Sequence, residues 1–457
     1  EGSVQKIGEN LRIVYRIFRR EGNVQIAGGK LDGAYQDIFI LQDRLVGEIA
    51  KNLAYEFKLQ NFRPAPLKLT GDITAYDYYL RGQEYLGKPT SHENTDEAIQ
   101  RFNAALLHDP RFALANTGLC NAYWKKYELT SSASWLSDAE RYCLLALEQD
   151  EQSAITYKAI GAIYRDTNRY QKAIEVLEKG MLVDKYAVTT AVVLASVYDL
   201  TGDKKKAEEL YIETINLAPK NWKAYEGYGY FLTRNGRYDE AINNYNKVLE
   251  FAAGHIFSLN NIGINYFYKN EFKKAALAFE QAAQIEPTSS IFANTGGMYY
   301  SSGEYQKAVD MFEKAIRLEP ENYQWMVCIA DAYKFIPAKK QLADEYFKRA
   351  IRLANEEINI NPNIARSYQY LARARAYFGE VSKANEMMAV ADTLDPESTE
   401  ALYAHLRIAV TESNDEKIRK YAKSLLETEY SVKLLLADPD FSVLKETRFN
   451  DLMAQQK

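Results

Sequence analysis

Cysteine is scarce in this chain, and its scarcity excludes two classes of protein. Cys120, Cys143 and Cys328 are the three cysteines among 457 residues. Three widely separated cysteines provide neither a disulfide framework nor the paired spacing of a zinc site. We therefore expect all three to be free thiols that are buried and pack as small hydrophobic side chains.

An excess of charge of one sign is absent as well. The chain has 57 Lys and Arg residues against 62 Asp and Glu residues, which gives a formal net charge of −5. A chain so close to balance lacks the basic surface that DNA- and RNA-binding proteins carry. We therefore predict that this region binds no nucleic acid.

Long apolar runs are also missing, although 47% of the residues are hydrophobic. A membrane-spanning helix needs about 20 consecutive apolar residues, and the sequence has no such run. The first residues also lack the cationic and apolar parts of an export signal. We expect no membrane span in this region and a cytoplasmic location. The alternative is that the chain is the extracytoplasmic part of a membrane-anchored parent protein.

Motifs that carry chemistry are absent too. The sequence contains no phosphate-binding glycine loop, no Gly-x-Ser-x-Gly elbow and no His-Glu-x-x-His metal helix. The four histidines are separated along the chain and have no cysteine or carboxylate at ligand spacing: His92, His108, His255 and His405. We therefore predict that the chain is not an enzyme and holds no cofactor and no metal ion.

A regular repeat is what the sequence does contain. A glycine or asparagine recurs at steps of 34, 34, 34 and 33 residues, at Asn168, Gly202, Gly236, Asn270 and Gly303. Each one lies between two segments of helical periodicity, where a chain that folds back needs a left-handed residue, which Gly and Asn tolerate best. A repeat of this length predicts a stack of helical hairpins.

Three further columns keep the same step, and they alternate small with large side chains. A small residue next to a large one predicts that the two helices of a hairpin approach closely. Prolines close several units, because proline cannot continue a helix. The small column is Gly161, Ala195, Gly229, Gly263 and Gly296; the aromatic column is Tyr164, Tyr198, Leu232, Tyr266 and Tyr299; the large column of the second helix is Leu177, Tyr211, Tyr245, Phe279 and Phe312; the prolines are Pro219, Pro287 and Pro320.

This fixed order of small residue, Tyr, Ala, Phe and Pro resembles the tetratricopeptide repeat. The resemblance is strongest from 153 to 320 and weakens on both sides. It implies a mainly α fold, an α-solenoid in the form of a superhelix of helical hairpins. We assign 73–430 to an array of about nine to ten hairpins. We assign 431–457 to a capping segment similar to the tail that closes many such arrays, in which apolar side chains cover the last hairpin: Phe441, Leu444, Phe449 and Leu452.

The first 60 residues follow a different rhythm. Apolar residues alternate with polar ones at Leu11, Ile13, Tyr15 and Ile17, as in a half-buried strand. The segments Gly2–Lys6 and Val24–Lys30 are its expected neighbours in an antiparallel meander, with Gly2–Lys6 as an open edge.

A helix is expected to follow the meander, after Asp37, which is a suitable N-cap residue. The order of these strands and the helix resembles the second half of a TolB-like α/β domain. We therefore assign 1–60 to a small, partial TolB-like α+β segment and 61–72, which holds Pro64, Pro66 and Gly71, to a linker.

A groove is the expected binding site, because the first helices of stacked hairpins leave one side unpaired and line a continuous concave face. Aromatic residues mixed with a few Arg and Asn residues are typical of peptide hot spots. For Phe267, Tyr268 and Tyr300 the alternative is packing against neighbouring hairpins. The helical phase predicts these groove residues: Lys158, Arg165, Glu226, Tyr230, Asn260, Ile264, Phe267, Tyr268, Tyr300, Lys334, Phe335, Arg366, Gln369, Arg373 and Tyr377.

Two modes of peptide recognition are distinguished by the residues of the groove. A clamp for a terminal carboxylate is excluded because Ala162 and Val192 occupy positions where polar partners of Lys158 would be needed. Near the C-terminal end, Arg366, Arg373 and Arg375 instead favour an acidic segment as ligand.

These observations predict a non-catalytic scaffold that binds a protein or peptide partner in its concave groove. The TolB-like resemblance implies an alternative, the sensory or regulatory arm of a larger bacterial signalling protein. Its effector domain, upstream of Glu1, would be a Ser/Thr kinase, a nucleotidyl cyclase or a winged-helix transcription regulator.

Overall fold

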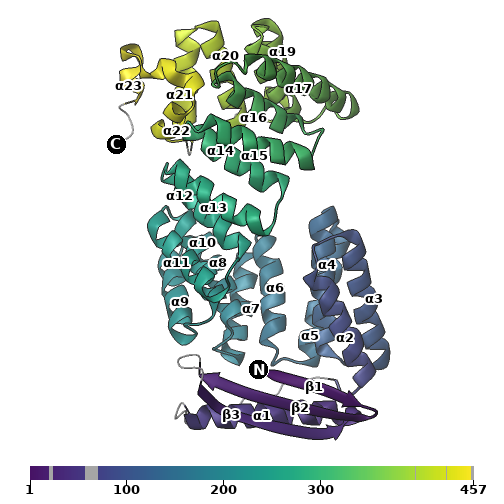
Figure 1. Cartoon of the computed structure of the whole chain (residues 1–457). Coiled ribbons are helices and arrows are strands. Elements are labelled where there is room, and N and C mark those ends of the chain that lie inside the picture. The colour runs from purple at the N-terminus through teal and green to yellow at the C-terminus, as the bar shows by residue number, and fades with distance from the viewer. Residues whose placement is uncertain (20–23, 57–69, 397, 429, 454–457) are drawn as a thin grey trace. The chain divides into compact units, whose positions relative to one another are not determined.

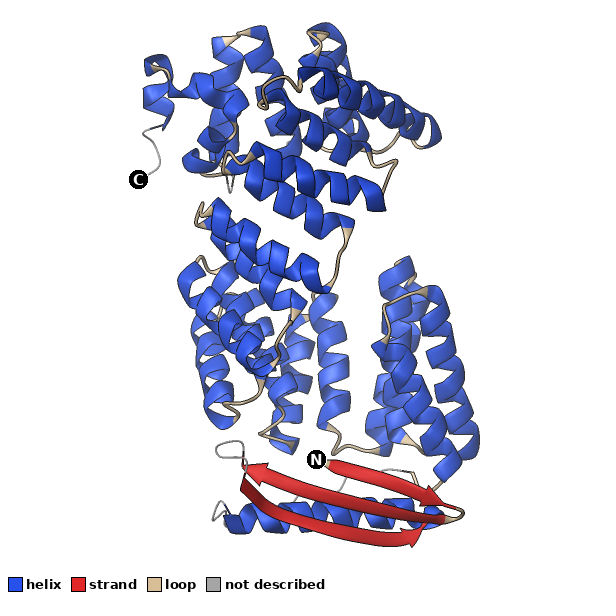
Figure 2. Cartoon of the chain, viewed as in Figure 1, coloured by secondary structure: helices blue, strands red, loops and turns tan. Residues whose placement is uncertain are grey.

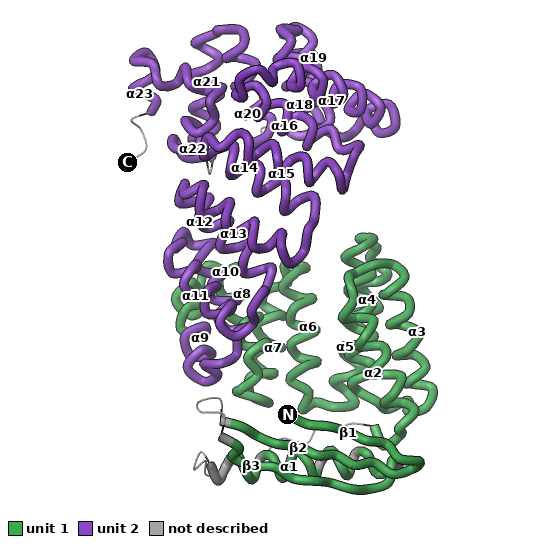
Figure 3. Tube along the Cα trace, in the orientation of Figure 1, with its two compact units in different colours: residues 1–210 green, residues 211–457 purple. Residues whose placement is uncertain are grey.

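The protein is described from a computed structural model that covers residues 1–19, 24–56, 70–396, 398–428 and 430–453. It is mainly helical, and a small sheet lies at its N-terminal end, as predicted (Figure 2). The chain divides into two compact units, unit 1 (residues 1–210) and unit 2 (residues 211–457), which are described separately (Figure 3).

The N-terminal sheet of unit 1 is an antiparallel meander in the order β1-β2-β3, as the alternation predicts. Leu11 and Ile13 of the central strand share a small core with Leu31 and Leu41, so the helix α1 covers one face (Figure 1). Along β1 every residue is exposed, and Val4 keeps 67% of its surface. The elements are β1 (Gly2–Ile7), β2 (Asn10–Arg19), β3 (Val24–Ala34), a 3₁₀ turn (Tyr35–Asp37) and α1 (Ile38–Glu56). Most of the predicted linker, up to residue 69, lies outside the described residues.

Helical hairpins form the rest of unit 1. Their helices are α2 (Ile73–Gly87), α3 (His92–His108), α4 (Ala113–Thr130), α5 (Ala133–Gln149), α6 (Ala154–Asp166), α7 (Tyr170–Val183), α8 (Val188–Leu200) and α9 (Lys204–Leu217), the last of which crosses into unit 2. The predicted turn residues adopt the left-handed conformation, with φ of 59° at Asn168 and 87° at Gly202.

Unit 2 continues the same pattern. Its paired helices are α10 (Trp222–Arg234), α11 (Tyr238–Phe251), α12 (Ile256–Tyr268), α13 (Phe272–Ile285), α14 (Ser289–Ser301), α15 (Tyr305–Leu318), α16 (Tyr323–Lys334), α17 (Lys340–Ile360), α18 (Ala365–Tyr377), α19 (Val381–Leu394), α20 (Thr399–Glu412) and α21 (Asp415–Leu426). The chain then forms α22 (Val432–Ala437), two 3₁₀ segments (Pro439–Lys445 and Thr447–Phe449) and α23 (Asn450–Met453). Within the described residues the helices from α2 to α21 follow one another as alternating first and second helices, and nine pairs of consecutive helices, from α2 with α3 to α20 with α21, pack as hairpins.

Close approach of the two helices in each hairpin explains the small column. A Cβ atom added at Gly263 would lie 2.7 Å from the ring of Phe279, and one added at Gly296 would lie 2.9 Å from the ring of Phe312. The predicted pairing of small and large residues is therefore confirmed, since any side chain at these glycines collides with a buried ring.

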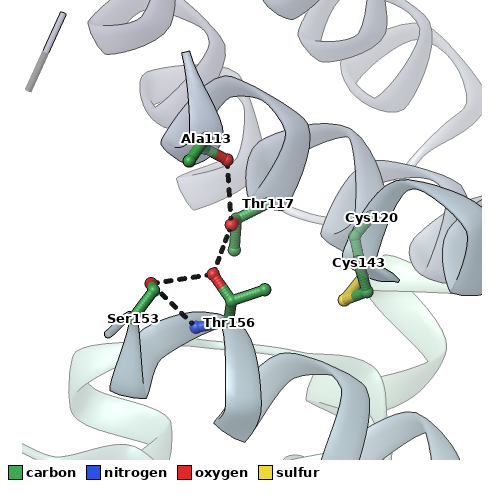
Figure 4. The surroundings of a disulfide bond; sticks show 6 residues. All are labelled: Ala113, Thr117, Cys120, Cys143, Ser153 and Thr156. Atoms are coloured by element: carbon green, nitrogen blue, oxygen red, sulfur yellow. Dashed lines mark hydrogen bonds between the residues drawn. A yellow bond between two sulfur atoms is a disulfide. The ribbon is translucent and has the colours of Figure 1, made fainter. Parts of the chain in front are cut away.

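The prediction for the cysteines is wrong at two of the three positions. Cys120 on α4 and Cys143 on α5 form a disulfide with Cα atoms 5.2 Å apart, and both residues are fully buried (Figure 4). Cys328 is a free thiol. The reason lies in the repeat itself: Cys120 stands in the small column and Cys143 in the large column, and these two columns meet in each hairpin, as Gly161 meets Leu177.

A buried polar contact also joins successive hairpins beside this disulfide. The hydroxyls of Thr117 on α4 and Thr156 on α6 are 2.7 Å apart (Figure 4). Thr117 also donates to the carbonyl oxygen of Ala113, so Thr156 is the donor to Thr117, and the hydroxyl of Ser153 lies 2.8 Å from that of Thr156. The first helices of two neighbouring hairpins therefore touch through groups whose hydrogen bonds are satisfied.

Candidate functional site

The candidate site is the surface formed by the first helices of unit 2, which we call the inner face: α10, α12, α14, α16, α18 and α20. Along this face α10 contacts α12, α14 contacts α16, α16 contacts α18, and α18 contacts α20. The same 34-residue step that sets the turns therefore places equivalent side chains side by side. The inner face has two parts, an apolar part on α10 and α12 and a charged part on α14 to α20.

The apolar part carries exposed hydrophobic side chains. Tyr230 on α10 and Ile264 on α12 occupy the same repeat position, directly after a small-column glycine, and keep 49% and 37% of their surface exposed. One turn before Ile264, the side-chain oxygen of Asn260 is buried and has no hydrogen-bond partner among the described residues. A partner that covers Tyr230 and Ile264 would remove their apolar surface from water.

Glu226, one turn before Tyr230, is half-buried and lies 3.7 Å from the ring of His255. Desolvation raises the pKa of Glu226, and the charge of Lys223 opposes this shift. Desolvation also lowers the pKa of His255. In both groups the shift therefore favours the neutral form.

Phe267 and Tyr268, at the end of α12, pack mainly within unit 2. The ring of Phe267 lies 6.3 Å from that of Phe272, and the ring of Tyr268 stacks on Tyr238 at 5.2 Å. The structure therefore places both rings against neighbouring helices, which is the alternative that the sequence left open.

The charged part is a cluster that we call the cationic cage, made of Lys334, Arg373 and Arg407 around Asp331. The Asp331 carboxylate, 5% exposed, accepts from Arg407 at 2.8 Å and from Arg373 at 3.0 Å. Lys334 lies 3.4 Å from the same carboxylate. Because Arg407 is only 9% exposed, its charge depends on these carboxylate partners and not on water.

The two carboxylates that complete the cage come from the C-terminal segment of the same chain. Asp438 accepts from Arg407 at 3.0 Å and from the hydroxyl of Tyr300 at 3.1 Å. Asp440 accepts from Lys334 at 2.6 Å and pairs with Arg407 at 2.8 Å. The chain's own tail thus occupies the charged part of the inner face, and α22 lies beside α14 (Figure 1).

Electrostatics keep the cage ionised. Desolvation raises the pKa of Asp331, but attraction by Arg407, Lys334 and Arg373 outweighs it and holds the pKa below the usual range. For Asp438, desolvation again raises the pKa, but Arg407 and the hydrogen bond from Tyr403 outweigh it and hold the pKa below the usual range. Desolvation lowers the pKa of Arg407, and the surrounding carboxylates raise it well above its ordinary value. All these groups are therefore charged at neutral pH.

The tail is anchored at both ends of the cage. Before it, Ser431 donates to the side-chain oxygen of Asn270 at 2.6 Å, in the turn between α12 and α13. After it, apolar side chains of the tail enter a buried cluster with residues of α20 and α21. The four tail residues expected to cover the last hairpin all lie in this cluster: Phe441, Leu444, Phe449 and Leu452.

The structure separates the three arginines that the sequence grouped. Arg373 lies in the cage, whereas Arg375 pairs with Glu380 at 2.6 Å and Arg366 is exposed. Arg366 lines a cavity of about 350 Å³ with Glu357 and others. The three do not form one anion-binding cluster, because Arg375 lies on the opposite side of α18 from Arg373, and Arg366 lies about 10 Å along the helix from Arg373, two turns earlier.

The remaining predicted residues have structural partners. Gln369 is buried and donates to Ser398 at 3.2 Å, and Tyr377 donates to Asp344 at 2.7 Å. Phe335 packs on Tyr305 at 5.1 Å. In unit 1, Lys158 is partly buried and Arg165 pairs with Asp166 at 2.6 Å.

Sequence reasoning missed Asp331 and Arg407 as parts of the inner face. A signal for Asp331 was present, since it directly follows Ala330, as Arg373 follows Ala372 and Tyr230 follows Gly229. The position after the small column points to the inner face in each of these hairpins. For Arg407 the signal was weaker, because Leu406 replaces the small residue.

Neither metal ligation nor membrane insertion is indicated by the described residues. Among them no group of three or more His, Cys, Asp or Glu side chains is arranged to hold a metal ion. Their helices include none with the length and apolar character needed to cross a membrane.

Comparison with known proteins identifies the repeats. Residues 156–185, 223–285 and 290–322 match family models described as tetratricopeptide repeat, so the chain contains these repeats, as predicted. A solved structure, the C-terminal part of a TPR repeat-containing protein from Cytophaga hutchinsonii, is 23% identical, covers 54% of this chain and 98% of that chain, and superposes with a TM-score of 0.41.

Curated relatives match over part of their length. The chain is 26% identical to BBSome complex member BBS4 of Bos taurus over 193 residues. This aligned segment covers 42% of this chain and 35% of that protein. It is 25% identical to mitochondrial import receptor subunit TOM70 of Rattus norvegicus over 170 residues. This second aligned segment covers 36% of this chain and 28% of that protein. The chain thus spans about a third of these relatives.

Proposed function

We propose that this chain is a non-catalytic scaffold whose inner face binds a protein or peptide partner. The observation that supports this function best is the apolar part of the inner face, where Tyr230 and Ile264 are exposed next to the unpartnered oxygen of Asn260. Exposed aromatic and aliphatic side chains around a buried acceptor are the elements of a binding hot spot.

A pair of substitutions with a matched control tests this function. Tyr230→Ala with Ile264→Ala removes the hydrophobic contact area of the inner face. Ile285→Ala with Leu318→Ala, which removes comparable side chains exposed by 49% and 51% on second helices, is the control. Truncation of a hot spot costs about 2 kcal/mol or more, which weakens binding about 30-fold.

The assay compares the proteins of the native cell that are retained by the immobilised wild type and by the two variants, with circular dichroism confirming that all three fold. A partner retained by the wild type and the control but lost from the inner-face variant is the expected result. Equal retention of every partner by both variants contradicts the proposed site.

We also propose an alternative, in which the chain is the regulatory arm of a larger bacterial signalling protein. The exposed edge strand β1 supports it, because Val4 and Ile7 keep 67% and 66% of their surface exposed on a strand with an unpaired edge. Such an edge fits pairing with a further segment. The reading frame upstream of the Glu1 codon tests this alternative; a start codon directly before Glu1 argues against it.

A further inference from the structure

Two acidic residues of the tail occupy the cationic cage in the manner of a bound ligand. The Asp438-Pro439-Asp440 segment runs across α14, α16 and α20 and presents one carboxylate to Tyr300 and Arg407 and the next to Lys334 and Arg407. These contacts join residues that are 138, 31 and 106 positions apart in the sequence. The cage is therefore built by the repeats and filled from outside them.

Charge balance shows what the cage requires. Lys334, Arg373 and Arg407 supply three positive charges, and Asp331 supplies one negative charge, so the cage alone carries a net charge of two positive units. Arg373 is 12% exposed and Arg407 is 9% exposed, so water replaces lost partners poorly. The cage is thus matched to a ligand that brings two negative charges.

Spacing and exposure narrow the chemistry of that ligand. The two carboxylates in the cage belong to residues i and i+2 at the start of the 3₁₀ segment Pro439–Lys445, where Asp438 is the N-cap. This arrangement places them on separate partners, Tyr300 and Lys334, with Arg407 between them. The side of the cage at Lys334 and Asp440 is the more open one, since these side chains are 19% and 20% exposed. An incoming acidic peptide has access there.

We propose that the cationic cage is a binding site for a partner segment with two acidic residues at i and i+2, and that Asp438 and Asp440 compete with it as an internal ligand. This inference rests on the proposed function of the inner face and specifies its charged part. The tail then raises the apparent dissociation constant of the partner segment, which equals the intrinsic constant divided by the fraction of molecules in which the cage is empty.

The apolar anchors of the tail allow a test that keeps the fold intact. Phe441 and Leu444 lie in the hydrophobic cluster of the last hairpin and are unchanged when the two carboxylates are neutralised. The test therefore uses the full chain with Asp438→Asn and Asp440→Asn. A matched control is Asp415→Asn with Asp451→Asn, two acidic residues that pair with arginines in exposed positions outside the cage.

A fluorescent peptide with the sequence of residues 433–445 serves as the probe, and a version with Asn at both acidic positions serves as its control. The expected result is that the peptide binds the Asp438→Asn, Asp440→Asn chain at least about tenfold more tightly than the wild type or the control variant. Addition of Arg407→Met to the binding variant abolishes the difference. Equal affinity for all chains, or affinity unaffected by Arg407→Met, overturns the proposal.

A measurement on the wild type keeps the test decisive if the variant fails to fold. Excess peptide is expected to displace the tail and to accelerate hydrogen exchange of the amides in 431–445. No acceleration at peptide concentrations that saturate binding overturns competition. If Tyr230→Ala with Ile264→Ala loses partner binding but the peptide has no effect, this inference alone is refuted. If the peptide binds as expected but Tyr230→Ala with Ile264→Ala retains every partner, the proposed function is refuted.

Discussion

Two adjacent glycines on α14 allow a sharp test of the packing that builds each hairpin. Gly296 and Gly297 share one helix, yet a Cβ at Gly296 would lie 2.9 Å from the ring of Phe312, whereas a Cβ at Gly297 would meet nothing within 4 Å. Alanine favours the helix over glycine by about 1 kcal/mol at either position. We therefore expect Gly297→Ala to stabilise unit 2 by about that amount.

Gly296→Ala gains the same helix propensity but forces the ring of Phe312, which is 3% exposed, out of its place. Overpacking of this kind costs about 1–3 kcal/mol, so the two variants should differ by about 2 kcal/mol. With a urea dependence of about 2 kcal/mol per M, the unfolding midpoint of Gly296→Ala should lie about 1 M below that of Gly297→Ala.

Urea unfolding monitored by circular dichroism measures both midpoints. In a double-mutant cycle, Phe312→Leu should cost less stability in the Gly296→Ala background than in the wild type, because the smaller side chain leaves room for the new methyl group. Coincident midpoints for the two alanine variants, or a Phe312→Leu cost that is the same in both backgrounds, would show that the small column does not set the helix spacing.

Three further predictions concern charge and sulfur. Arg407→Met should destabilise unit 2 by about 3–5 kcal/mol in chemical denaturation, because it leaves buried carboxylates unpaired, whereas Arg419→Met at an exposed pair should cost less than about 1 kcal/mol; similar costs would refute the buried network. The folded pKa of Asp331 is depressed, so this residue stabilises the fold above about pH 4 and loses the effect as the pH falls through the folded value. In pH-dependent denaturation, the stability gap between the wild type and Asp331→Asn should therefore be constant from about pH 7 to 5 and shrink below about pH 4. Reduction of the Cys120–Cys143 disulfide, which closes a loop across 23 positions, should lower the stability of unit 1 by about 3 kcal/mol, and alkylation of the unreduced, denatured protein followed by mass spectrometry should leave both cysteines unmodified.

The repeat was predictable from sequence because its cause is local. Asn168 and Asn270 mark turns because a left-handed backbone is needed where a helix folds back, and both adopt it with φ of 59° and 56°. Gly296 and Phe312 pair because they lie at fixed offsets on the two helices of one hairpin. Such constraints recur in each hairpin, so the sequence displays the same pattern many times.

The capping role of the tail was predicted, but its acidic contacts with the inner face and the disulfide were not, for different reasons. The contact between Tyr300 and Asp438 spans 138 positions and occurs once, so no periodic pattern records it. The Cys120–Cys143 pair does follow the column pattern, but composition alone gave the opposite answer. For the inner face, helical phase identified exposed positions such as Tyr230, but it gave no information on which positions the chain covers itself, as at Arg373.

The bond between Ser431 and Asn270 has a consequence for how unit 2 unfolds. A plain array of repeats frays from its ends, since each hairpin touches only its neighbours. Here residues 161 positions apart are joined, and the intervening hairpins from α13 to α21 form a closed ring of contacts. Melting one hairpin within that ring breaks the closure as well, so these hairpins should lose their structure together in a single cooperative transition.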